Sequence, residues 1–475
     1  GVASVGDAVS CSSLMNRITH FTVRIEVGTP PQAFDVVADT GSDSVIVTSC
    51  ACRDTKHCDP SNKCFRGQNV SSTFLMHTVY DPNSASPQVP VVVMSFGSGQ
   101  IEAVVASDLV RVGRVDANMS EGLLLMVDQA LRMAGPFEGI LGLGMPRKQA
   151  APTPEPAPTP QPNATAGQAV STTFLPHGFL QTAGITRFSM CFNEGEDGVL
   201  RLGVPEDPAA LGSIGEAHWG LDFRGISVGD FSAPVQFCTD DSMKPGQATP
   251  CGAIPDSGTT VMMAPADHIK LLLEQLCDRW DRCREEVPRS NKPKHELFQM
   301  ILMACETWLT EAEGLDSLPE LHFHLRGADG RNKTLSLAGA SYVMETYQEE
   351  MHHVTKHLDG IFPTDEEADV PTGRQMKVCV PAFGTHDFTT AKNGPVWILG
   401  TPIFYEFQVA YNMETKPPSI SFSEAPCGAC VSRTSLFLAG EGEGVRMARR
   451  ARRARMPRQT YGPLRLPSMG TSGPL

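Results

Sequence analysis

The sequence predicts an all-β chain built from two related halves. The first observation is an acidic motif, Asp39-Thr40-Gly41-Ser42, that returns later in the chain as Asp256-Ser257-Gly258-Thr259. The second is a glycine-rich apolar strand that also occurs twice, as Gly139-Ile140-Leu141-Gly142 and as Trp397-Ile398-Leu399-Gly400. Such self-similarity indicates an internal duplication that brings two carboxylates to one seam.

The composition indicates a soluble, globular protein. The chain has 475 residues, of which 41% are hydrophobic and 19% charged, enough for two or three domains with substantial cores. The net charge is −14, but residues 432–475 hold nine arginines and two glutamates and carry +7, which leaves about −21 for the remainder. An acidic body argues against binding to nucleic acid, and no apolar run is long enough to span a bilayer.

Cysteines and glycosylation sequons point to the secretory pathway. The chain has fourteen cysteines, an even number, and four N-x-S/T sequons, at Asn69, Asn118, Asn163 and Asn332. Both features favour an oxidising compartment, either extracellular or a vacuolar, lysosomal or other endomembrane lumen. Because the chain begins Gly1-Val2-Ala3, without Met or an apolar signal core, we expect a mature form or a fragment.

Two hairpins are expected in the first half. Residues 20–47 alternate apolar and polar positions around Gly28-Thr29-Pro30-Pro31, which predicts a hairpin leading into the Asp39 strand. Residues 91–105 hold two apolar runs around a glycine-rich tip; on its own this pattern is that of an ordinary surface hairpin. Residues 147–170 are rich in Pro, Ala and Thr and should form an extended, solvated loop.

A cysteine cluster lies between these two hairpins. Its four members fall within fifteen residues, with His57 beside them: Cys50, Cys52, Cys58 and Cys64. A zinc site is one alternative, but the spacing lacks the paired C-x2-C of common zinc sites. Two local disulfides are favoured, with the pairing left open, and no metal or cofactor is expected.

The second half is expected to mix strands with helices. β character resumes at Phe188-Ser189-Met190-Cys191-Phe192, and helical periodicity begins at Pro265 and again near Glu296, which predicts a helical insertion over residues 265–310. Residues 345–375 are polar and predict an irregular insertion. Residues 431–475 are Arg-rich without apolar periodicity, so a disordered tail is favoured over a specific basic ligand-binding arm.

The doubled acid motif has a direct chemical interpretation. Two carboxylates a few ångströms apart cannot both ionise easily, so they share one proton and titrate as a pair. The ionised member can act as a general base on water, while the protonated member polarises a carbonyl and later protonates the leaving amine. The hydroxyls of Ser42 and Thr259 could donate to the outer carboxylate oxygens, and Thr40 and Ser257 could interlock across the seam.

The ordered set of motifs resembles the pepsin-like aspartic proteases over about residues 18–427. It consists of the two acid motifs, Phe137-Glu138-Gly139-Ile140-Leu141-Gly142 and Trp397-Ile398-Leu399-Gly400. The resemblance implies a bilobal double-β-barrel fold, with lobes at 1–186 and 187–430, a cleft between them, and endopeptidase activity on protein or peptide substrates at acidic pH. The cysteine insert over 50–64 and the strand at 188–192 look more like the plant nepenthesin-type and apicomplexan plasmepsin V-like branches than gastric pepsin.

The resemblance also implies roles for individual residues. Asp39 and Asp256 would be the catalytic pair, and Gly41 and Gly258 would offer backbone contacts to substrate. The flap would span residues 94–100, with Ser95, Phe96, Gly97 and Ser98 at its tip. An apolar pocket beside the scissile bond, which implies a preference for hydrophobic side chains, would be lined by Val37, Leu131 and Ile140. Disulfides implied in the second lobe are Cys238–Cys251, Cys305–Cys379 and a local Cys277–Cys283, with Cys11, Cys191, Cys427 and Cys430 unassigned.

Three positions depart from the family pattern. Phe96 stands where a flap tyrosine is usual, and Ile46 stands where its tryptophan partner is usual, so both ends of one hydrogen bond are missing together. A more apolar flap is therefore expected. Thr401 stands where an Asp is common, which should change the titration of the acid pair.

Two other functions are alternatives to an acid endopeptidase. The first is a binding or inhibitor protein that keeps the fold and has lost catalysis. The altered flap favours this alternative, but the presence of both acids argues against it. A half-enzyme that must dimerise is disfavoured because both motifs lie in one chain. A monomer is therefore expected.

Overall fold

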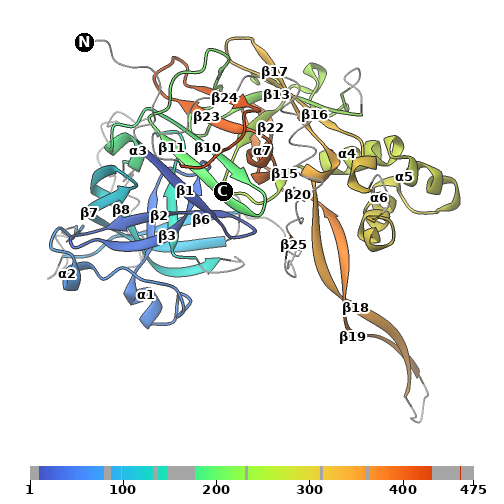
Figure 1. The fold of residues 1–475 in the computed structure, drawn as a ribbon, viewed down its shortest axis with the longest axis horizontal. Coiled ribbons are helices and arrows are strands. Elements are labelled where there is room, and N and C mark those ends of the chain that lie inside the picture. Colours follow the sequence, from blue (N-terminus) through green and yellow to red (C-terminus); the bar gives the residue numbers. More distant parts are fainter. Residues whose placement is uncertain are drawn as a thin grey trace, which may run out of the picture.

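The computed structural model describes residues 10–79, 87–97, 99–131, 137–146, 177–229, 234–310, 314–358, 364–430 and 460–461. Strands dominate the described chain, and the three helices of residues 266–303 gather on one side of it (Figure 1). The predicted bilobal β fold is confirmed, with helices added to it. The loop expected at 147–170, with the sequon at Asn163, lies outside the described residues. The expected tail also lies outside them, apart from a two-residue strand.

The first half is a set of antiparallel and parallel strands with short helices at its edge. The elements are β1 (Ser10–Asn16), β2 (Phe21–Val27), β3 (Gln32–Asp39), β4 (Val45–Thr48), α1 (Cys50–Asp54), α2 (Gly67–Val70), β5 (Leu75–Met76), β6 (Val91–Phe96), β7 (Gly99–Val112), β8 (Val115–Leu131), β9 (Gly139–Gly142) and α3 (Phe179–Thr182). Both predicted hairpins are present, as antiparallel β2–β3 and β6–β7. Alternate residues of β2 are buried in the core, which explains the period of two.

The second half adds more strands and the helices. Its elements are β10 (Arg187–Asn193), β11 (Glu196–Leu202), β12 (Leu211–Gly212), β13 (Leu221–Val228), β14 (Gly252–Pro255), β15 (Met262–Ala264), α4 (Ala266–Arg279), α5 (Asp281–Glu286), α6 (Lys294–Met303), β16 (Leu321–Arg326), β17 (Asn332–Leu337), β18 (Val343–Leu358), β19 (Thr364–Pro381), β20 (Phe383–Thr385), β21 (Thr389–Thr390), β22 (Gly394–Leu399), α7 (Thr401–Glu406), β23 (Gln408–Asn412), β24 (Ser419–Ser423) and β25 (Thr460–Tyr461).

One large sheet crosses the middle of the chain. Its order is β12-β24-β23-β10-β11-β1-β2-β3-β9-β4-β8-β7-β5, so strands from both ends of the sequence meet in it. β1 lies between β11 and β2 and thereby joins strands of the second half to those of the first. A second sheet, β17-β16-β13-β14-β22-β15-β20, belongs to the second half alone. The sheets therefore fix the position of one half against the other.

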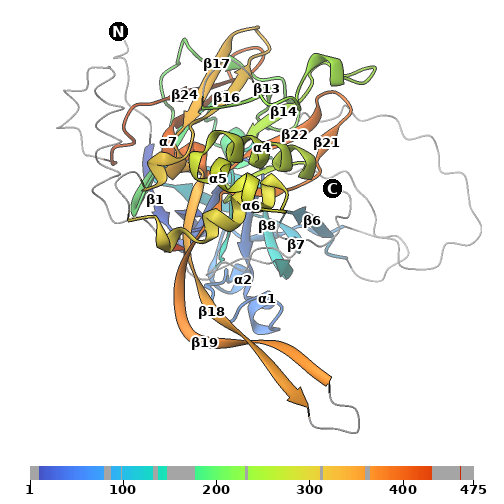
Figure 2. The ribbon, with the colours of Figure 1, turned by 90° about the vertical axis from the view of Figure 1, so that its right-hand side faces the viewer.

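The helices expected after Pro265 form a packed layer beside this second sheet. α4 buries the apolar face formed by Ile269, Leu272, Leu273 and Leu276. Its C-terminal Trp280 stacks edge-on against Phe298 of α6, with ring centroids 5.7 Å apart. The disulfide Cys277–Cys283 closes the turn between α4 and α5. This layer covers one side of the protein (Figure 2).

The expectation of an irregular insertion at 345–375 is wrong. β18 and β19 form a long antiparallel hairpin that projects away from the body (Figures 1 and 2). Pairing between the backbones of β18 and β19 defines this ladder, and a hairpin that projects away from the core buries little apolar surface, so it does not require the apolar alternation of a strand that packs on a core. The polar composition therefore concealed regular structure.

All fourteen cysteines lie in the described residues and form seven disulfides. The cluster after β4 contains Cys50–Cys64 and Cys52–Cys58, so its thiols are not available as zinc ligands. The second half has Cys238–Cys251 and Cys305–Cys379. The four unassigned cysteines form Cys11–Cys430 and Cys191–Cys427, which hold the segment after β24 against β1 and β10.

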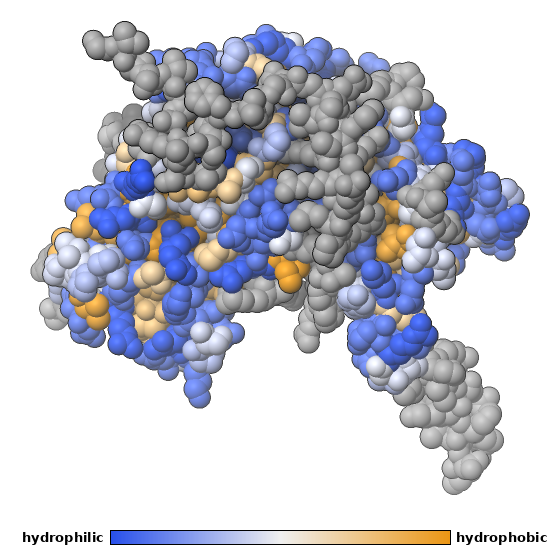
Figure 3. Space-filling model, in the orientation of Figure 1, coloured by the Kyte–Doolittle hydropathy of each residue, from blue (hydrophilic) through white to orange (hydrophobic). Residues whose placement is uncertain are grey.

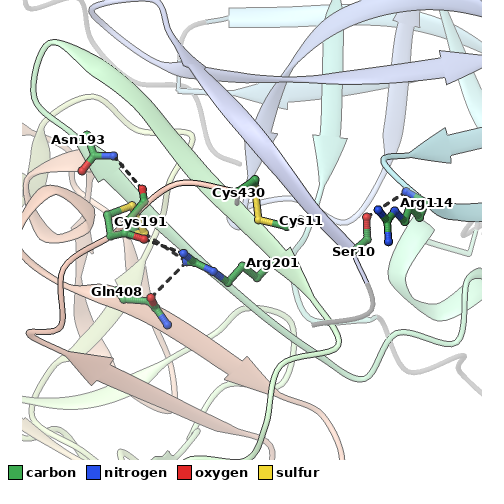
Figure 4. The surroundings of a disulfide bond; sticks show 10 residues. Ser10, Cys11, Arg114, Cys191, Asn193, Arg201, Gln408 and Cys430 are labelled. Carbon is green, nitrogen blue, oxygen red and sulfur yellow. Dashed lines mark hydrogen bonds between the residues drawn. A yellow bond between two sulfur atoms is a disulfide. The ribbon is translucent and has the colours of Figure 1, made fainter. Parts of the chain in front are cut away.

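Figure 4 shows these last two bridges beside Arg201. The Arg201 guanidinium donates to the carbonyl oxygen of Cys427 at 2.7 Å and to the side chain of Gln408 at 3.3 Å. Burial lowers the pKa of Arg201.

Hydrophilic residues cover most of the described surface on the face seen in Figure 3, and apolar residues form small separate patches there.

Candidate active site

The two acids occupy equivalent places in the two halves. Asp39 is the last residue of β3, and Asp256 directly follows β14. In the first half β9 runs parallel to β3 and antiparallel to β4. In the second half β22 runs parallel to β14 and antiparallel to β15. Each glycine-rich strand is therefore inserted between the strand that carries an acid and the strand that follows it.

The residues after the acids interlock across the seam. The Thr40 backbone N–H donates to Ser257 Oγ and the Ser257 backbone N–H donates to Thr40 Oγ1, both at 3.0 Å. The two hydroxyls then donate onward, from Thr40 to the Pro255 carbonyl at 3.0 Å and from Ser257 to the Ala38 carbonyl at 2.7 Å. Both side chains are fully buried, so the contact fixes the two acid loops against each other.

Each acid has the same set of hydrogen-bond donors. Asp39 accepts from the Gly41 backbone N–H at 2.8 Å and from the Ser42 hydroxyl at 2.5 Å. Asp256 accepts from the Gly258 backbone N–H at 2.9 Å and from the Thr259 hydroxyl at 2.6 Å. These are the supporting hydroxyls expected from the sequence. The repeat in sequence thus becomes a repeat in geometry.

Glycine is required in both loops because each glycine faces the opposite acid. A Cβ on Gly258 would lie 2.4 Å from Asp39 Oδ1, and a Cβ on Gly41 would lie 2.8 Å from the Asp256 carboxyl carbon. Both distances are shorter than van der Waals contact. The two carboxyl groups therefore approach across a space that only glycine leaves open.

The acids are nearly buried, with Asp39 7% and Asp256 9% exposed. Burial, and next the negative charge of Asp256 and its hydrogen bond to Asp39, raise the pKa of Asp39 well above its usual range. The pair consequently keeps one proton under conditions in which an exposed aspartate is ionised. One carboxylate beside one carboxylic acid is an arrangement that can activate water and protonate a leaving group.

An apolar cluster lies beside the acids on the first-half side. Val37, Ile46 and Ile140 are buried in it, and Phe96 and Leu131 pack against it. The expected pocket residues, the flap residue Phe96 and Ile46, which stands where the tryptophan partner is usual, are thus brought together in one cluster. Phe96 ends β6 and pairs with Gly99 at the tip of the β6–β7 hairpin. Ser98 lies outside the described residues.

Thr401 has a partner that the sequence did not reveal. It begins α7 and is buried, and its hydroxyl donates to the Thr260 carbonyl at 2.7 Å while its backbone N–H donates to the Thr259 carbonyl at 2.8 Å. These bonds fasten the loop that follows Asp256. A neutral hydroxyl therefore holds the place where the family pattern has a carboxylate.

Sequence reasoning missed Tyr411, whose side chain contacts the residues on both sides of the Thr40–Ser257 interlock. Its hydroxyl lies 3.2 Å from the Pro255 carbonyl oxygen and 3.5 Å from Thr40 Oγ1. Its ring stacks on Phe188 at 4.7 Å and contacts Trp219 at 4.9 Å between centroids. The alternation of Phe407, Val409 and Tyr411 in the sequence could have indicated that Tyr411 lies on the buried face of a strand.

A mostly β fold whose two halves each present one interlocked aspartate defines the class of aspartic-type endopeptidases. A family model described as eukaryotic aspartyl protease matches residues 20–425. The chain belongs to this family.

Named relatives agree with that assignment. Renin from Echis ocellatus is 22% identical over 407 residues, which cover 84% of this chain and 79% of the renin. Renin-2 from Mus musculus is 22% identical over 423 residues, or 86% of this chain and 81% of the relative. Cathepsin E from Mus musculus is 25% identical over 266 residues, about half of each chain. The closeness to the nepenthesin-type and plasmepsin V-like branches stays a prediction.

Proposed function

We propose that Asp39 and Asp256 form the catalytic dyad of an endopeptidase that hydrolyses polypeptides through an activated water. The observation that carries the proposal is the matched pair of hydrogen-bond sets around two nearly buried, mutually hydrogen-bonded carboxyl groups. The ionised member of the pair removes a proton from water, which attacks the peptide carbonyl carbon. The protonated member donates to the carbonyl oxygen, and the amine leaves with a proton from the pair.

The surroundings of the dyad favour an extended substrate with hydrophobic side chains at the scissile bond. Val37 and Ile140 are 5% and 6% exposed, and they present apolar surface together with Phe96 and Leu131. Burying an apolar side chain against such a surface is favourable, whereas burying a charge there is costly. Cleavage of a peptide library should therefore enrich aliphatic and aromatic residues beside the cut bond.

The pH profile should be bell-shaped with an acidic optimum. At low pH both acids are protonated, so no base remains and the rate falls. As pH rises through the raised pKa of Asp39, the shared proton is lost and the general acid disappears. Initial rates on a quenched peptide between pH 2 and 9 would check this, with stability measured at each pH as a control. A rate that stays constant into the alkaline range would contradict it.

Phe96 is expected to close over the substrate in place of the usual tyrosine. Phe96→Ala should lower kcat/KM about tenfold, because part of a phenyl ring then no longer covers apolar substrate. Val93 is a matched control, since it lies on the same strand but is 59% exposed. Val93→Ala should leave kcat/KM nearly unchanged. Equal effects of the two substitutions would argue against a flap role for Phe96.

A binding or inhibitor protein is the alternative, favoured only by the absence of a tyrosine from the flap. Its signature would be tight capture of a protein without turnover. Incubation of the purified chain with a denatured protein at acidic pH, followed by mass spectrometry, separates the two functions. New peptides that are suppressed by pepstatin support the protease, and an intact bound protein supports the alternative.

The cysteines and sequons bear on the compartment, and the two acids bear on the oligomeric state. Seven disulfides and three exposed sequon asparagines, Asn69, Asn118 and Asn332, suit an oxidising lumen of the secretory pathway or the extracellular space. Among the described residues, no helix has the length and hydropathy needed to cross a membrane. Since one chain supplies both acids, a monomer is sufficient, and sedimentation of the active protein tests this.

A further inference from the structure

The outer edge of β18 carries an added strand. β25, formed by Thr460 and Tyr461, pairs in parallel with Glu345 and Thr346. β18 therefore lies between β19 and β25 in a three-stranded sheet near the base of the projecting hairpin (Figure 1). A strand edge offers unpaired backbone N–H and C=O groups, and an extended segment can bind to it by continuing the ladder.

The base of this hairpin adjoins the loop that follows Asp256. The Ala382 backbone N–H donates to the Tyr342 carbonyl at 2.7 Å, and the Met262 N–H donates to the Ala382 carbonyl at 2.9 Å. Met344 packs with Val380 and Ala382, and Val261 packs against the same cluster. The edge that β25 occupies thus begins where the hairpin packs against the second half.

Carboxylates surround this part of the edge. Glu345 is 4% exposed and accepts from Lys377 Nζ at 3.1 Å. Glu406 accepts a hydrogen bond from the Ser341 hydroxyl. Burial, and next the charge of Glu320, raise the pKa of Tyr342, which places Glu320 near that residue.

The chain just before β25 has the opposite charge. Residues 446–458 contain seven arginines and no acidic residue: Arg446, Arg449, Arg450, Arg452, Arg453, Arg455 and Arg458. Guanidinium groups form short, often bidentate hydrogen bonds to carboxylates and lose little hydration when they do so. The sequence on one side of the contact therefore complements the surface on the other.

We infer that the edge of β18 and the carboxylates Glu320, Glu345 and Glu406 form a docking site for the Arg-rich segment 446–458 of the same chain. The segment binds in cis as the continuation of β25. The backbone pairing of β25 with Glu345 and Thr346 supplies the register. Charge supplies the rest of the affinity. The inference does not depend on the proposed dyad, because none of these residues belongs to it.

The test introduces two changes separately into the full chain and measures, for each, the rate of hydrogen exchange of the backbone amides at 344–347. Thr460→Pro removes a backbone N–H from β25 and restricts its backbone without changing the charge, and a quadruple Arg→Glu change at 452, 453, 455 and 458 reverses charge without blocking the backbone. Each should make these amides exchange at least about tenfold faster. In the unmodified chain, 0.5 M salt should act in the same direction as the charge reversal.

Two controls keep the result interpretable. Thr471→Pro and Arg433→Glu lie in the same tail outside the docking segment and should leave the exchange unchanged, and the amides of β14 should stay protected in every variant. Unchanged exchange at 344–347 in both main variants would overturn the docking site. An effect of Thr460→Pro alone would overturn the role of the arginines. Protection that grows with protein concentration, with dimers in sedimentation, would show docking between copies and overturn binding in cis.

Discussion

Asp256→Asn and Asp39→Asn are each expected to lower kcat/KM by roughly 10⁴-fold, because residues that act as one catalytic unit fail together when either is lost. An amide cannot take part in the proton exchange that the pair performs. Its oxygen can still accept from the backbone N–H of Gly41 or Gly258, and its NH2 group can donate to the hydroxyl of Ser42 or Thr259, which then acts as acceptor, so the loops should keep their geometry. Steady-state cleavage of a quenched peptide measures the effect.

Stability distinguishes lost chemistry from lost folding in this experiment. Because the folded pKa of Asp39 is raised, the folded state binds more protons than the unfolded state once pH exceeds the ordinary range of an aspartate. Stability from this group is therefore full at low pH and is lost as pH rises towards the folded pKa. The Asp39→Asn protein has no titrating group at this position, so it does not lose stability as pH rises. Its thermal midpoint at neutral pH should therefore equal or exceed that of the unmodified protein.

A control and a contradiction complete the test. Asp116→Asn changes an exposed carboxylate that is paired with Arg111, and it should leave activity nearly unchanged. If either dyad variant keeps more than about a tenth of the activity while folded, the two aspartates are not the catalytic pair.

Gly258→Ala is expected to lower kcat/KM by about 100-fold, since a displacement near 1 Å at the reacting groups costs that much. Its methyl group would stand 2.4 Å from Asp39 Oδ1, so the carboxyl group must move away from the seam. The same substitution on Gly252, the first residue of the strand β14 that leads to Asp256, is the matched control. A Cβ there would meet its nearest side-chain atom at 3.4 Å, which is ordinary contact.

The crystal structure of the Gly258→Ala protein would show the cause directly. We expect the Asp39 carboxyl group to be rotated or shifted while Thr40 and Ser257 keep their mutual hydrogen bonds. Activity within a few-fold of the unmodified enzyme would mean that the seam can widen without penalty, against the close approach of the acids seen here.

The sequence predicted those elements that a short stretch of neighbouring residues defines or that occur twice in the chain. The acid motifs, the inserted glycine-rich strands and the amphipathic α4 could all be recognised from a few neighbouring residues. The hydroxyl contacts of Thr40 and Ser257 were predictable because the second motif repeats the first. Residue by residue, this part of the site needed no knowledge of the fold.

The remainder depended on contacts between distant segments. Tyr411 reaches Thr40 across 371 residues, and no pattern near Tyr411 indicates that partner. Thr401 was noticed only as a departure, because its acceptor is a backbone carbonyl on another loop. The β18–β19 hairpin escaped prediction because its regularity lies in backbone pairing and its side chains carry no hydrophobic period.

The pairing of Cys11 with Cys430 has a consequence for a chain that has been cut by a protease. The other six bridges each join cysteines on the same side of the segment between Leu131 and His177. A single cut within that segment would leave two fragments, each with one of the aspartates, and Cys11–Cys430 would be their sole covalent link. The cut protein would migrate as one species without reductant and as two with it, and a reducing environment would leave the two halves of the dyad held together by non-covalent contacts alone, those of the shared sheet and of Thr40 with Ser257.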